Sequence, residues 1–338
     1  MIMVISKLTN NNIAYYCLHA EVTYLNSKVG VPVSIDSASA IVLKSVIDPI
    51  CQDIINDTDN LAFVLDFDGI ENIQVNAVVE GISNLCNTHN KKIVLANIKE
   101  SIIKFFTFDV TKHMKQVVPK NEGCYAFCSL CEIDCNKMSN CEEVFALSVP
   151  DKLKKYVKEE VMEHHSSSVY LTSYIDIKQL ITLDKSFVLY CIYRLAKKIW
   201  INWINEAERK DSIKSKEKPI LICQSLNGSF IASVLSSLLD LDIFIIDSIG
   251  PVNKLYRSLG AIINPGKKYI VVSDVVCLGT EVKITKNIIE YLGGIYYGNV
   301  SIVRVASIKK YNNIETVFTI DKNNNKEFNY RIITSLDQ

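Results

Sequence analysis

The segment Gly266–Val282 reads GKKYIVVSDVVCLGTEV and decides the fold of the second half of the chain. Its first part, Lys268–Ser273, is apolar through the centre, which is typical of a buried strand. A short loop, Val275–Gly279, leads from this strand into a helix that we expect over Thr280–Leu292. The last backbone N–H groups of such a loop point at one spot beside the positive end of the helix dipole. The segment therefore predicts an anion site.

Three residues of this segment add to the anion site. Gly279 allows the backbone to approach a phosphate closely because it carries no Cβ atom. Thr280 offers a hydroxyl donor and a helix cap. Asp274, at the end of the strand, is an acceptor suited to ribose hydroxyls or to the water shell of a metal.

The sequence around this segment alternates between strands and helices. Further apolar strands are expected at Pro219–Cys223, Asp242–Ile246 and Tyr296–Val303, and amphipathic helices at Phe187–Trp203 and Phe230–Leu239. This alternation predicts an open, mainly parallel, twisted sheet flanked by helices. Ligands of such sheets bind beyond the carboxyl ends of the strands.

The segment resembles the phosphoribosyl pyrophosphate motif of the type I phosphoribosyltransferases, and that of the orotate enzymes most closely. Ser273 and Asp274 stand where the family has its acidic pair, and the phosphate-binding positions are those of Cys277, Leu278, Gly279 and Thr280. The resemblance implies a phosphoribosyltransferase fold over residues 161–338 that binds phosphoribosyl pyrophosphate or a nucleotide together with Mg²⁺.

Other parts of the second half resemble this family in the same order. The stretch CQSLNGSFIASVL matches the loop that binds pyrophosphate, which implies roles for Gln224, Ser225, Asn227 and Gly228. The segment Ser248–Gly266 stands where the family has its mobile catalytic loop. There, Lys254 and Arg257 are candidates to hold pyrophosphate, with Asp274 as the third catalytic candidate. A solvated loop charge is an equally good interpretation of each basic residue.

Three departures from the family pattern leave the function open. Ser273 replaces the first carboxylate, Cys223-Gln224 replaces small residues, and Asp247-Ser248 stands where the orotate enzymes carry Arg-Lys. A carboxylate at position 247 repels pyrophosphate unless a metal bridges the two. The leading hypothesis is an enzyme that transfers phosphoribosyl to a nitrogenous base, or the reverse reaction. One alternative is a catalytically weak sensor that binds phosphoribosyl pyrophosphate or a nucleotide and signals to a protein partner through the domain formed by the first third of the chain. The other is a structural interaction protein held together by its cysteine-rich segment.

The first third of the chain, residues 1–110, predicts a small α/β domain. We expect strands at Met1–Leu8, Ala62–Phe67 and Lys92–Ala96, and helices at Ala38–Ile55 and around Val78–Cys86. The stretch from Leu61 to Ile98 resembles a STAS domain. This implies a docking or dimerisation module, without the family's phosphorylatable serine, because residues 74–77 read QVNA. An unrelated α/β domain is the alternative.

Residues 111–160 form a cysteine-rich connector. Cys128-x-x-Cys131 is spaced like a zinc knuckle, and Cys135 and Cys141 would complete four ligands of a structural Zn²⁺. Reduced thiols without metal, or a redox role, are the alternatives. His164 and His165 are interpreted as turn residues, and Lys152–Glu163 as a charged helix.

The composition narrows the choice of partners. The 338 residues contain 37 Lys and Arg against 37 Asp and Glu, so the net charge gives no reason to expect nucleic acid or an anionic membrane. No apolar stretch reaches the ~20 residues of a membrane span. The short apolar start lacks the features of a signal peptide. We expect a cytoplasmic protein that forms a homodimer, as is usual in the family it resembles, or a larger assembly.

Overall fold

The computed structural model describes most of the chain, which divides into two compact units, residues 1–148 and 149–338. The described residues are 4–19, 41–68, 70, 72–107, 114–116, 125–127, 141–163, 169–204, 218–246, 263–305, 313–321, 328 and 332–334. Within these ranges no helix has the length and apolar character needed to cross a membrane.

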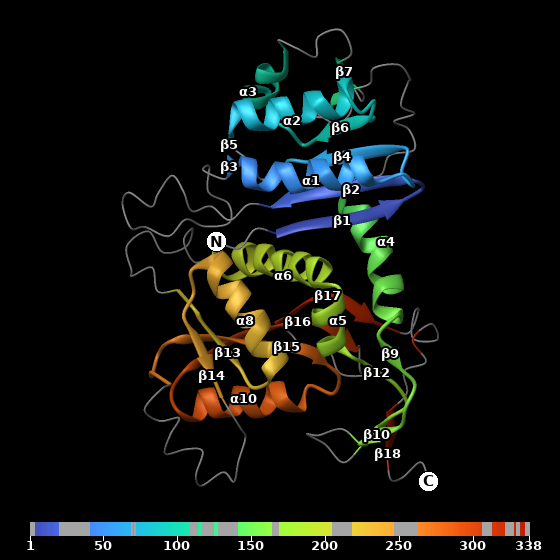
Figure 1. Ribbon diagram of the computed structural model, residues 1–338. Helices are drawn as coiled ribbons and strands as arrows, with labels where there is room; N and C mark the ends of the chain where they lie inside the picture. The colour runs from blue at the N-terminus through green and yellow to red at the C-terminus, as the bar shows by residue number, and fades with distance from the viewer. Residues whose placement is uncertain are drawn as a thin grey trace. The chain divides into compact units, whose positions relative to one another are not determined.

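Unit 1 is built on a six-stranded sheet with the order β1-β2-β4-β6-β8-β7 (Figure 1). Its strands are β1 (Val4–Asn10), β2 (Ile13–His19), β4 (Ala62–Asp66), β6 (Ile93–Ala96), β7 (Met114–Gln116) and β8 (Tyr125–Phe127). The three central strands β2, β4 and β6 are parallel, whereas β1, β7 and β8 join in antiparallel pairs. A separate two-stranded ladder joins β3 (Ile41–Val42) to β5 (Asn72–Ile73).

One face of the unit 1 sheet carries the main core. The helices α1 (Lys44–Asn56) and α2 (Val75–Asn87) bury their apolar sides in the same cluster as alternate residues of the strands, among them Tyr16, Phe63 and Leu65. The short helices α3 (Glu100–Ile103) and η1 (Lys104–Thr107) complete this cluster. The intervening strand residues point to the other face because strand side chains alternate. That face is also buried at Cys17, Val64 and Asp66.

The expected elements of unit 1 are largely confirmed, with one correction. The strands predicted near residues 1–8, 62–67 and 92–96 and the helix near 78–86 are present. The helix predicted over Ala38–Ile55 instead begins at Lys44, because Ile41 and Val42 pair with β5. Residues 38–40 lie outside the described part. Whether the unit is STAS-like stays a prediction.

Unit 2 contains a five-stranded sheet with the order β14-β13-β15-β16-β17, in which every pair is parallel. The strands are β13 (Ile220–Cys223), β14 (Ile243–Ile245), β15 (Lys268–Val276), β16 (Ile295–Val305) and β17 (Ile314–Ile320). In chain order the first strand lies between the second and the third, so the winding reverses between β13 and β15. Ligands of open parallel sheets bind at this kind of switch point.

Helices cover both faces of the unit 2 sheet (Figure 1). The helices α6 (Lys185–Ile199) and α8 (Leu226–Leu239) lie over one face, and α10 (Thr280–Tyr291) over the other. Beneath α10, Ile222, Tyr269 and Val271 pack with Ile288 and Ile289. The predicted mixed α/β fold with a parallel sheet is therefore confirmed for this unit.

Three expectations for unit 2 need correction. The segment Lys152–Glu163 is not a helix: α4 (Cys141–Lys154) ends there, and the short strands β9 (Val157–Lys158) and β10 (Met162–Glu163) follow. Residues 164–180 read HHSSSVYLTSYIDIKQL, an alternation of polar and apolar residues that predicts one half-buried strand. The structure instead shows β11 (Val169–Leu171), β12 (Tyr174–Ile175) and then the helix α5 (Ile177–Leu183). Asp176 ends the strand pattern because its side chain accepts a hydrogen bond from the backbone N–H of Gln179 and caps α5. β15 continues to Val276, so the loop before α10 is shorter than predicted.

The remaining elements of unit 2 are small. The π-helical turn η3 (Trp200–Ile204) continues α6, so the helical segment ends within one residue of Trp203, where the sequence predicted its end. β18 (Ile332–Thr334) pairs with β11, which also pairs with β10. β9 pairs with β12. The sequence did not predict β17, which extends the parallel sheet beyond β16.

Candidate functional site

Two loops meet where the winding of the unit 2 sheet reverses. After β13, Ser225 caps α8: its hydroxyl oxygen accepts a hydrogen bond of 2.9 Å from the backbone N–H of Gly228. After β15, residues Cys277–Gly279 lead directly into α10. Because both strands are parallel, both loops and both helix N-termini lie at the same edge of the sheet.

Gly279 gives the second loop its shape. Its φ of 71° lies in the left-handed region, which a glycine adopts without strain. The chain turns there into a helix of 12 residues. The first N–H groups of α10 therefore face the loop, together with the positive end of the helix dipole. The loop that leads into a helix N-terminus is therefore present as expected, and its use as an anion site stays a prediction.

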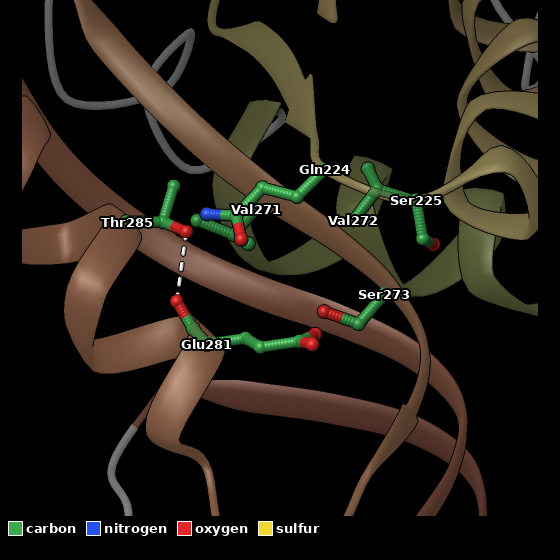
Figure 2. Close-up of a pocket in the computed structure, with 7 residues that line it drawn as sticks. All are labelled: Gln224, Ser225, Val271, Val272, Ser273, Glu281 and Thr285. Atoms are coloured by element: carbon green, nitrogen blue, oxygen red, sulfur yellow. Dashed lines mark hydrogen bonds between the residues drawn. The ribbon is translucent and has the colours of Figure 1, made fainter. Parts of the chain in front are cut away.

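Two adjoining hollows lie at this edge of the sheet, and Ser273 and Glu281 line both. The first hollow spans about 230 Å³ when the open solvent at its mouth is included, and Figure 2 shows its lining side chains. Of the predicted site residues, Gln224, Ser225 and Ser273 line it. The second hollow spans about 240 Å³ on the same measure, and its lining includes the predicted residues Ser273, Cys277, Leu278, Gly279 and Thr280.

Gln224 lines the first hollow with an amide that lacks a protein partner. Its Nε2 and Oε1 atoms are both buried and make no hydrogen bond within the described part of the chain. A buried amide without a partner costs about 1–3 kcal/mol, so a ligand or a water that bonded to it would be favoured. The thiol of the preceding Cys223 adds no charge here, because burial raises its pKa.

Asp274 lies near the carboxyl end of β15, and its predicted role toward a ligand stays a prediction. It lines neither hollow. Its Oδ2 accepts a hydrogen bond of 2.8 Å from Nδ2 of Asn227, in the first turn of α8, and its Oδ1 accepts one from the backbone N–H of Val275. Asp274 thus ties the two loops together. The side chain is half-buried, so part of it is open to a ligand.

Glu281 is the residue of this site that sequence reasoning missed. It stands in the first turn of α10, where the helix dipole favours a carboxylate, and its side chain points toward Ser273 (Figure 2). A negative charge at this position opposes an anionic ligand unless a cation lies between them. The signal is present in the sequence, because Glu281 directly follows the Gly-Thr pair of the predicted phosphate loop.

Polar groups beneath the loop fix Ser273. The buried Asn299 donates from Nδ2 to Oγ of Ser273 over 3.1 Å and to the carbonyl of Val271 over 3.0 Å. Nearby, the hydroxyl of the buried Thr285 donates to the backbone carbonyl of Glu281. Ser273 is thus held as a partner of the core and is only 8% exposed.

Several predicted site residues lie outside the described part of the chain. They are Lys254 and Arg257 of the expected catalytic loop, Asp247 at its start, and the expected zinc ligands Cys128, Cys131 and Cys135. Cys141, the fourth expected ligand, is described and is the first residue of α4. Their proposed roles stay predictions.

Comparison with solved structures finds similarity to phosphoribosyltransferases. A purine phosphoribosyltransferase from Pyrococcus horikoshii is 20% identical over 39% of this chain and 82% of its own, with a TM-score of 0.28. The orotate phosphoribosyltransferase of Aeropyrum pernix is 15% identical over 55% of this chain and 98% of its own, with a TM-score of 0.33. The UMP synthase of Leishmania donovani is 11% identical over 83% of this chain and 55% of its own, with a TM-score of 0.39.

Identities and TM-scores this low carry no inference about activity. No protein-family model and no curated protein matches the chain.

Proposed function

We propose that unit 2 binds phosphoribosyl pyrophosphate or a related nucleotide and transfers its phosphoribosyl group to a nitrogenous base. The observation that carries this proposal is the backbone cradle of Cys277–Thr280, which opens at the switch point of a parallel sheet. A phosphate fits such a cradle because N–H groups and the helix dipole converge there. The same residues resemble the phosphoribosyl pyrophosphate motif, and this resemblance supports a phosphoribosyl compound as the ligand.

The residues of the site divide into two groups by the part of the ligand that they suit. The backbone of Leu278–Gly279 and the hydroxyl of Thr280 suit the 5-phosphate. Gln224 and Ser225, on the first hollow, suit the polar diphosphate or the base. Asp274 would accept hydrogen bonds from ribose hydroxyls while Asn227 holds its orientation.

The reaction needs little covalent chemistry from the protein. A nitrogen of the base attacks C1 of the ribose, the bond from C1 to the pyrophosphate oxygen breaks, and the base loses a proton to solvent. Positioning and charge stabilisation supply most of the rate. The oxygen donors Asp274 and Glu281 fit Mg²⁺, a hard cation that prefers carboxylates. When bound, Mg²⁺ would neutralise the diphosphate, and it would also offset the charge of Glu281.

Calorimetric titration with phosphoribosyl pyrophosphate and Mg²⁺ tests the proposal. We expect the wild type to bind, and Thr280→Val and Asp274→Asn each to weaken binding at least about tenfold, as loss of a charge-assisted hydrogen bond predicts. Asp242→Asn is the matched control, since Asp242 is exposed and lies before β14, at the opposite edge of the sheet. Pyrophosphate release is measured in the same samples with a panel of bases.

The outcomes separate the parts of the proposal. Failure of the wild type to bind would remove the proposal altogether. Binding without pyrophosphate release for any base would leave a ligand-binding site and remove the transfer reaction. A Glu281→Gln variant that binds more tightly without Mg²⁺, and loses its response to Mg²⁺, would support the role given to that carboxylate.

A further inference from the structure

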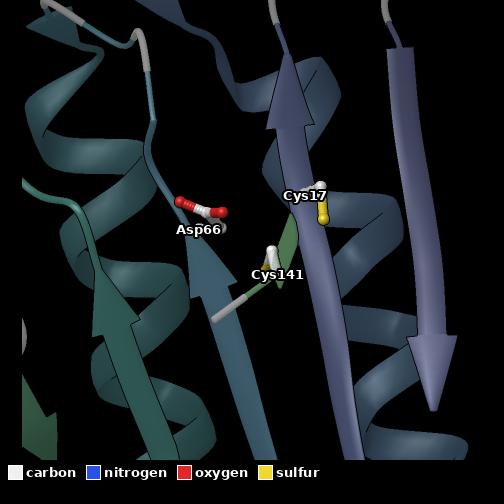
Figure 3. Close-up of side chains that lie close together, drawn as sticks. All are labelled: Cys17, Asp66 and Cys141. Carbon is white, nitrogen blue, oxygen red and sulfur yellow. The ribbon is translucent and has the colours of Figure 1, made fainter. Parts of the chain in front are cut away.

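Three side chains that are far apart in the sequence converge in unit 1. They are Cys17 on β2, Asp66 at the end of β4 and Cys141 at the start of α4. Their sulfur and carboxylate oxygen atoms all lie within 4.8 Å of one another, and Figure 3 shows the three side chains between β2 and β4. Cys17 is fully buried, and Asp66 and Cys141 are each 4% exposed.

The sheet fixes the position of two of these side chains. Cys17 and Asp66 are register partners on neighbouring parallel strands, so both project from the same face of the sheet. This is the face opposite to the main core, whose cluster takes Tyr16 and Leu65. Asp66 is the last residue of β4 and Cys17 lies two residues before the end of β2, so both are near the edge where parallel sheets bind ligands.

Hydrogen bonds fix the orientation of the Asp66 carboxylate. Its Oδ1 accepts two hydrogen bonds, one of 2.7 Å from Nδ2 of Asn97 and one of 3.0 Å from the backbone N–H of Asp68. Asn97 follows β6, whose last residue, Ala96, pairs with Asp66. With Oδ1 committed to these donors, Oδ2 is the oxygen that can serve another ligand. Carboxylates that bind metals are commonly held by such neighbouring donors.

The third side chain enters from outside the sheet. Cys141 is the first residue of α4, a helix of 14 residues with Glu142 and Glu143 in its first turn. Cysteine binds a metal as its thiolate. Val144 and Phe145 of the same turn are buried, so packing anchors the start of the helix.

When they bind a metal, the two thiols lose their protons, so the two sulfur atoms and the carboxylate together carry three negative charges, which a divalent cation largely offsets. Mg²⁺ and Ca²⁺ prefer oxygen donors alone, and Cu⁺ prefers sulfur alone. Zn²⁺ accepts both. A common centre lies within about 2.8 Å of all three atoms, so shifts of a few tenths of an ångström would reach the zinc–sulfur distance of about 2.3 Å.

We propose that Cys17, Asp66 and Cys141 bind one Zn²⁺ in unit 1, with the fourth tetrahedral position left to a further ligand such as water. Of the zinc ligands predicted from the sequence, only Cys141 belongs to this set. Among the residues that the structure describes, this is the one group of three metal-ligating side chains. Cys17 and Asp66 were not predictable as ligands, because 48 and 74 residues separate the three in sequence and only the strand register joins them.

Metal analysis of the full chain tests the zinc site. The protein is purified, treated with a mild chelator, reloaded with Zn²⁺ and passed through gel filtration. We expect zinc to remain bound, with X-ray absorption showing two sulfur neighbours and oxygen at the remaining positions. Cys17→Ser and Cys141→Ser should lose this sulfur-ligated zinc, and Asp66→Asn should bind it at least about tenfold more weakly. Cys51→Ala, which removes a buried thiol from α1, should keep the zinc of the wild type.

Two results would overturn the proposal. One is a wild type that binds no zinc, or zinc without sulfur neighbours, a measurement that needs no variant to fold. The other is a folded Cys17→Ser, Cys141→Ser double variant whose zinc keeps its two sulfur neighbours, which would place the metal on other cysteines. Circular dichroism establishes the fold of each variant. If the double variant does not fold, cobalt substitution of Asp66→Asn decides: an unchanged spectrum and affinity would remove the carboxylate from the site.

Discussion

In both sheets of this protein, polar side chains lie at the edge formed by the carboxyl ends of the parallel strands. The two sheets differ in which side chains these are. In unit 1 the carboxyl ends of β2 and β4 carry Cys17 and Asp66, which are buried and joined by Cys141. In unit 2 the carboxyl ends of β13 and β15 lead to hollows that are partly open, where the polar groups are hydroxyls, an amide and the carboxylate of Glu281.

The sheet architecture thus sets where a ligand can bind, and the side chains at that edge set which ligand it is. In unit 1, buried sulfur and oxygen donors suit a borderline-soft cation, and their burial leaves no room for a large organic ligand. In unit 2, backbone N–H groups around Gly279, with neutral donors beside them, suit a phosphorylated molecule. If the two edges are this distinct, a change at one edge should leave ligand binding at the other unaffected.

The largest effect is expected at Asn97, which positions Asp66 without being a proposed ligand. Asn97→Ala removes the hydrogen bond to Oδ1, and we expect zinc affinity to fall about 10–100-fold, as is typical when a residue that holds a metal ligand is lost. Competition with a chromophoric zinc chelator measures this change. Binding of phosphoribosyl pyrophosphate to unit 2 should stay at the wild-type value.

Asn90→Ala is the matched control for Asn97→Ala. Both asparagines have a positive φ, 51° at Asn90 and 54° at Asn97, so alanine introduces the same backbone strain at each position. Of the two, Asn97 is the one whose side chain bonds to Asp66. Equal losses of zinc affinity in the two variants would mean that backbone strain, and not the hydrogen bond, controls the site.

The two edges also differ in how far the sequence alone revealed them. The strand, the glycine and the helix of residues 268–291 are consecutive, so their local pattern predicted the turn from strand to helix at Gly279 before the fold was known. The strand was expected to end at Ser273, but it continues to Val276 because Val275 and Val276 pair with Val303 and Arg304 of β16. Such pairing depends on two segments that are distant in the sequence, so the sequence of either segment alone does not predict it.

The site in unit 1 could not be predicted for the same physical reason. Cys17 has no metal-binding spacing to any other cysteine, and Asp66 ends an apolar strand like many buried aspartates. The spacing of Cys128 and Cys131 predicted a zinc site in the connector instead. Both of these cysteines, and Cys135, lie outside the described residues. The register of β2 against β4 brings Cys17 beside Asp66, and neither segment alone predicts that register.

Gly228 offers a way to disturb the unit 2 edge alone. A Cβ atom there would lie 3.0 Å from Oγ of Ser225, 3.1 Å from the carbonyl oxygen of Val272 and 3.3 Å from Cβ of Cys223. We expect Gly228→Ala to lower the free energy of unfolding by about 1–3 kcal/mol, as overpacking does. It should also weaken ligand binding, because it displaces Ser225 from the hollow. Zinc affinity should not change.

Gly266→Ala separates the effect of overpacking on the site from a general loss of stability. Gly266 has a φ of 80°, and a Cβ atom added there would meet nothing within 4 Å, so alanine adds only backbone strain, of about 1 kcal/mol. Tryptophan fluorescence during urea unfolding reports on unit 2, since the two tryptophans, Trp200 and Trp203, both lie there. A Gly266→Ala variant that lost as much ligand affinity as Gly228→Ala would contradict the role given to the first hollow.

The smallest effect is expected at Asp57, which ends α1 in unit 1. Burial alone would raise the pKa of its carboxyl group, but hydrogen bonds from Lys7 and Asn60 and from the backbone of Asp59 outweigh burial and hold the pKa well below its usual range. A carboxyl group with a lowered pKa in the folded state stabilises the protein above the unfolded pKa of about 3.9 and loses this contribution as the pH falls further.

Asp57→Asn should therefore lower the free energy of unfolding of unit 1 by about 1 kcal/mol at neutral pH, because the bond to the half-exposed Lys7 is partly screened by solvent. The cost should shrink as the pH falls below about 4, where wild-type Asp57 also loses its charge. Urea unfolding followed by circular dichroism measures both units, and tryptophan fluorescence measures unit 2 alone. Because the hydrogen bonds of the Asp57 side chain join it to Lys7 and to residues 59 and 60, and not to the zinc ligands, zinc affinity per folded chain should stay unchanged. A cost that grew on acidification would reverse the sign expected for this carboxylate.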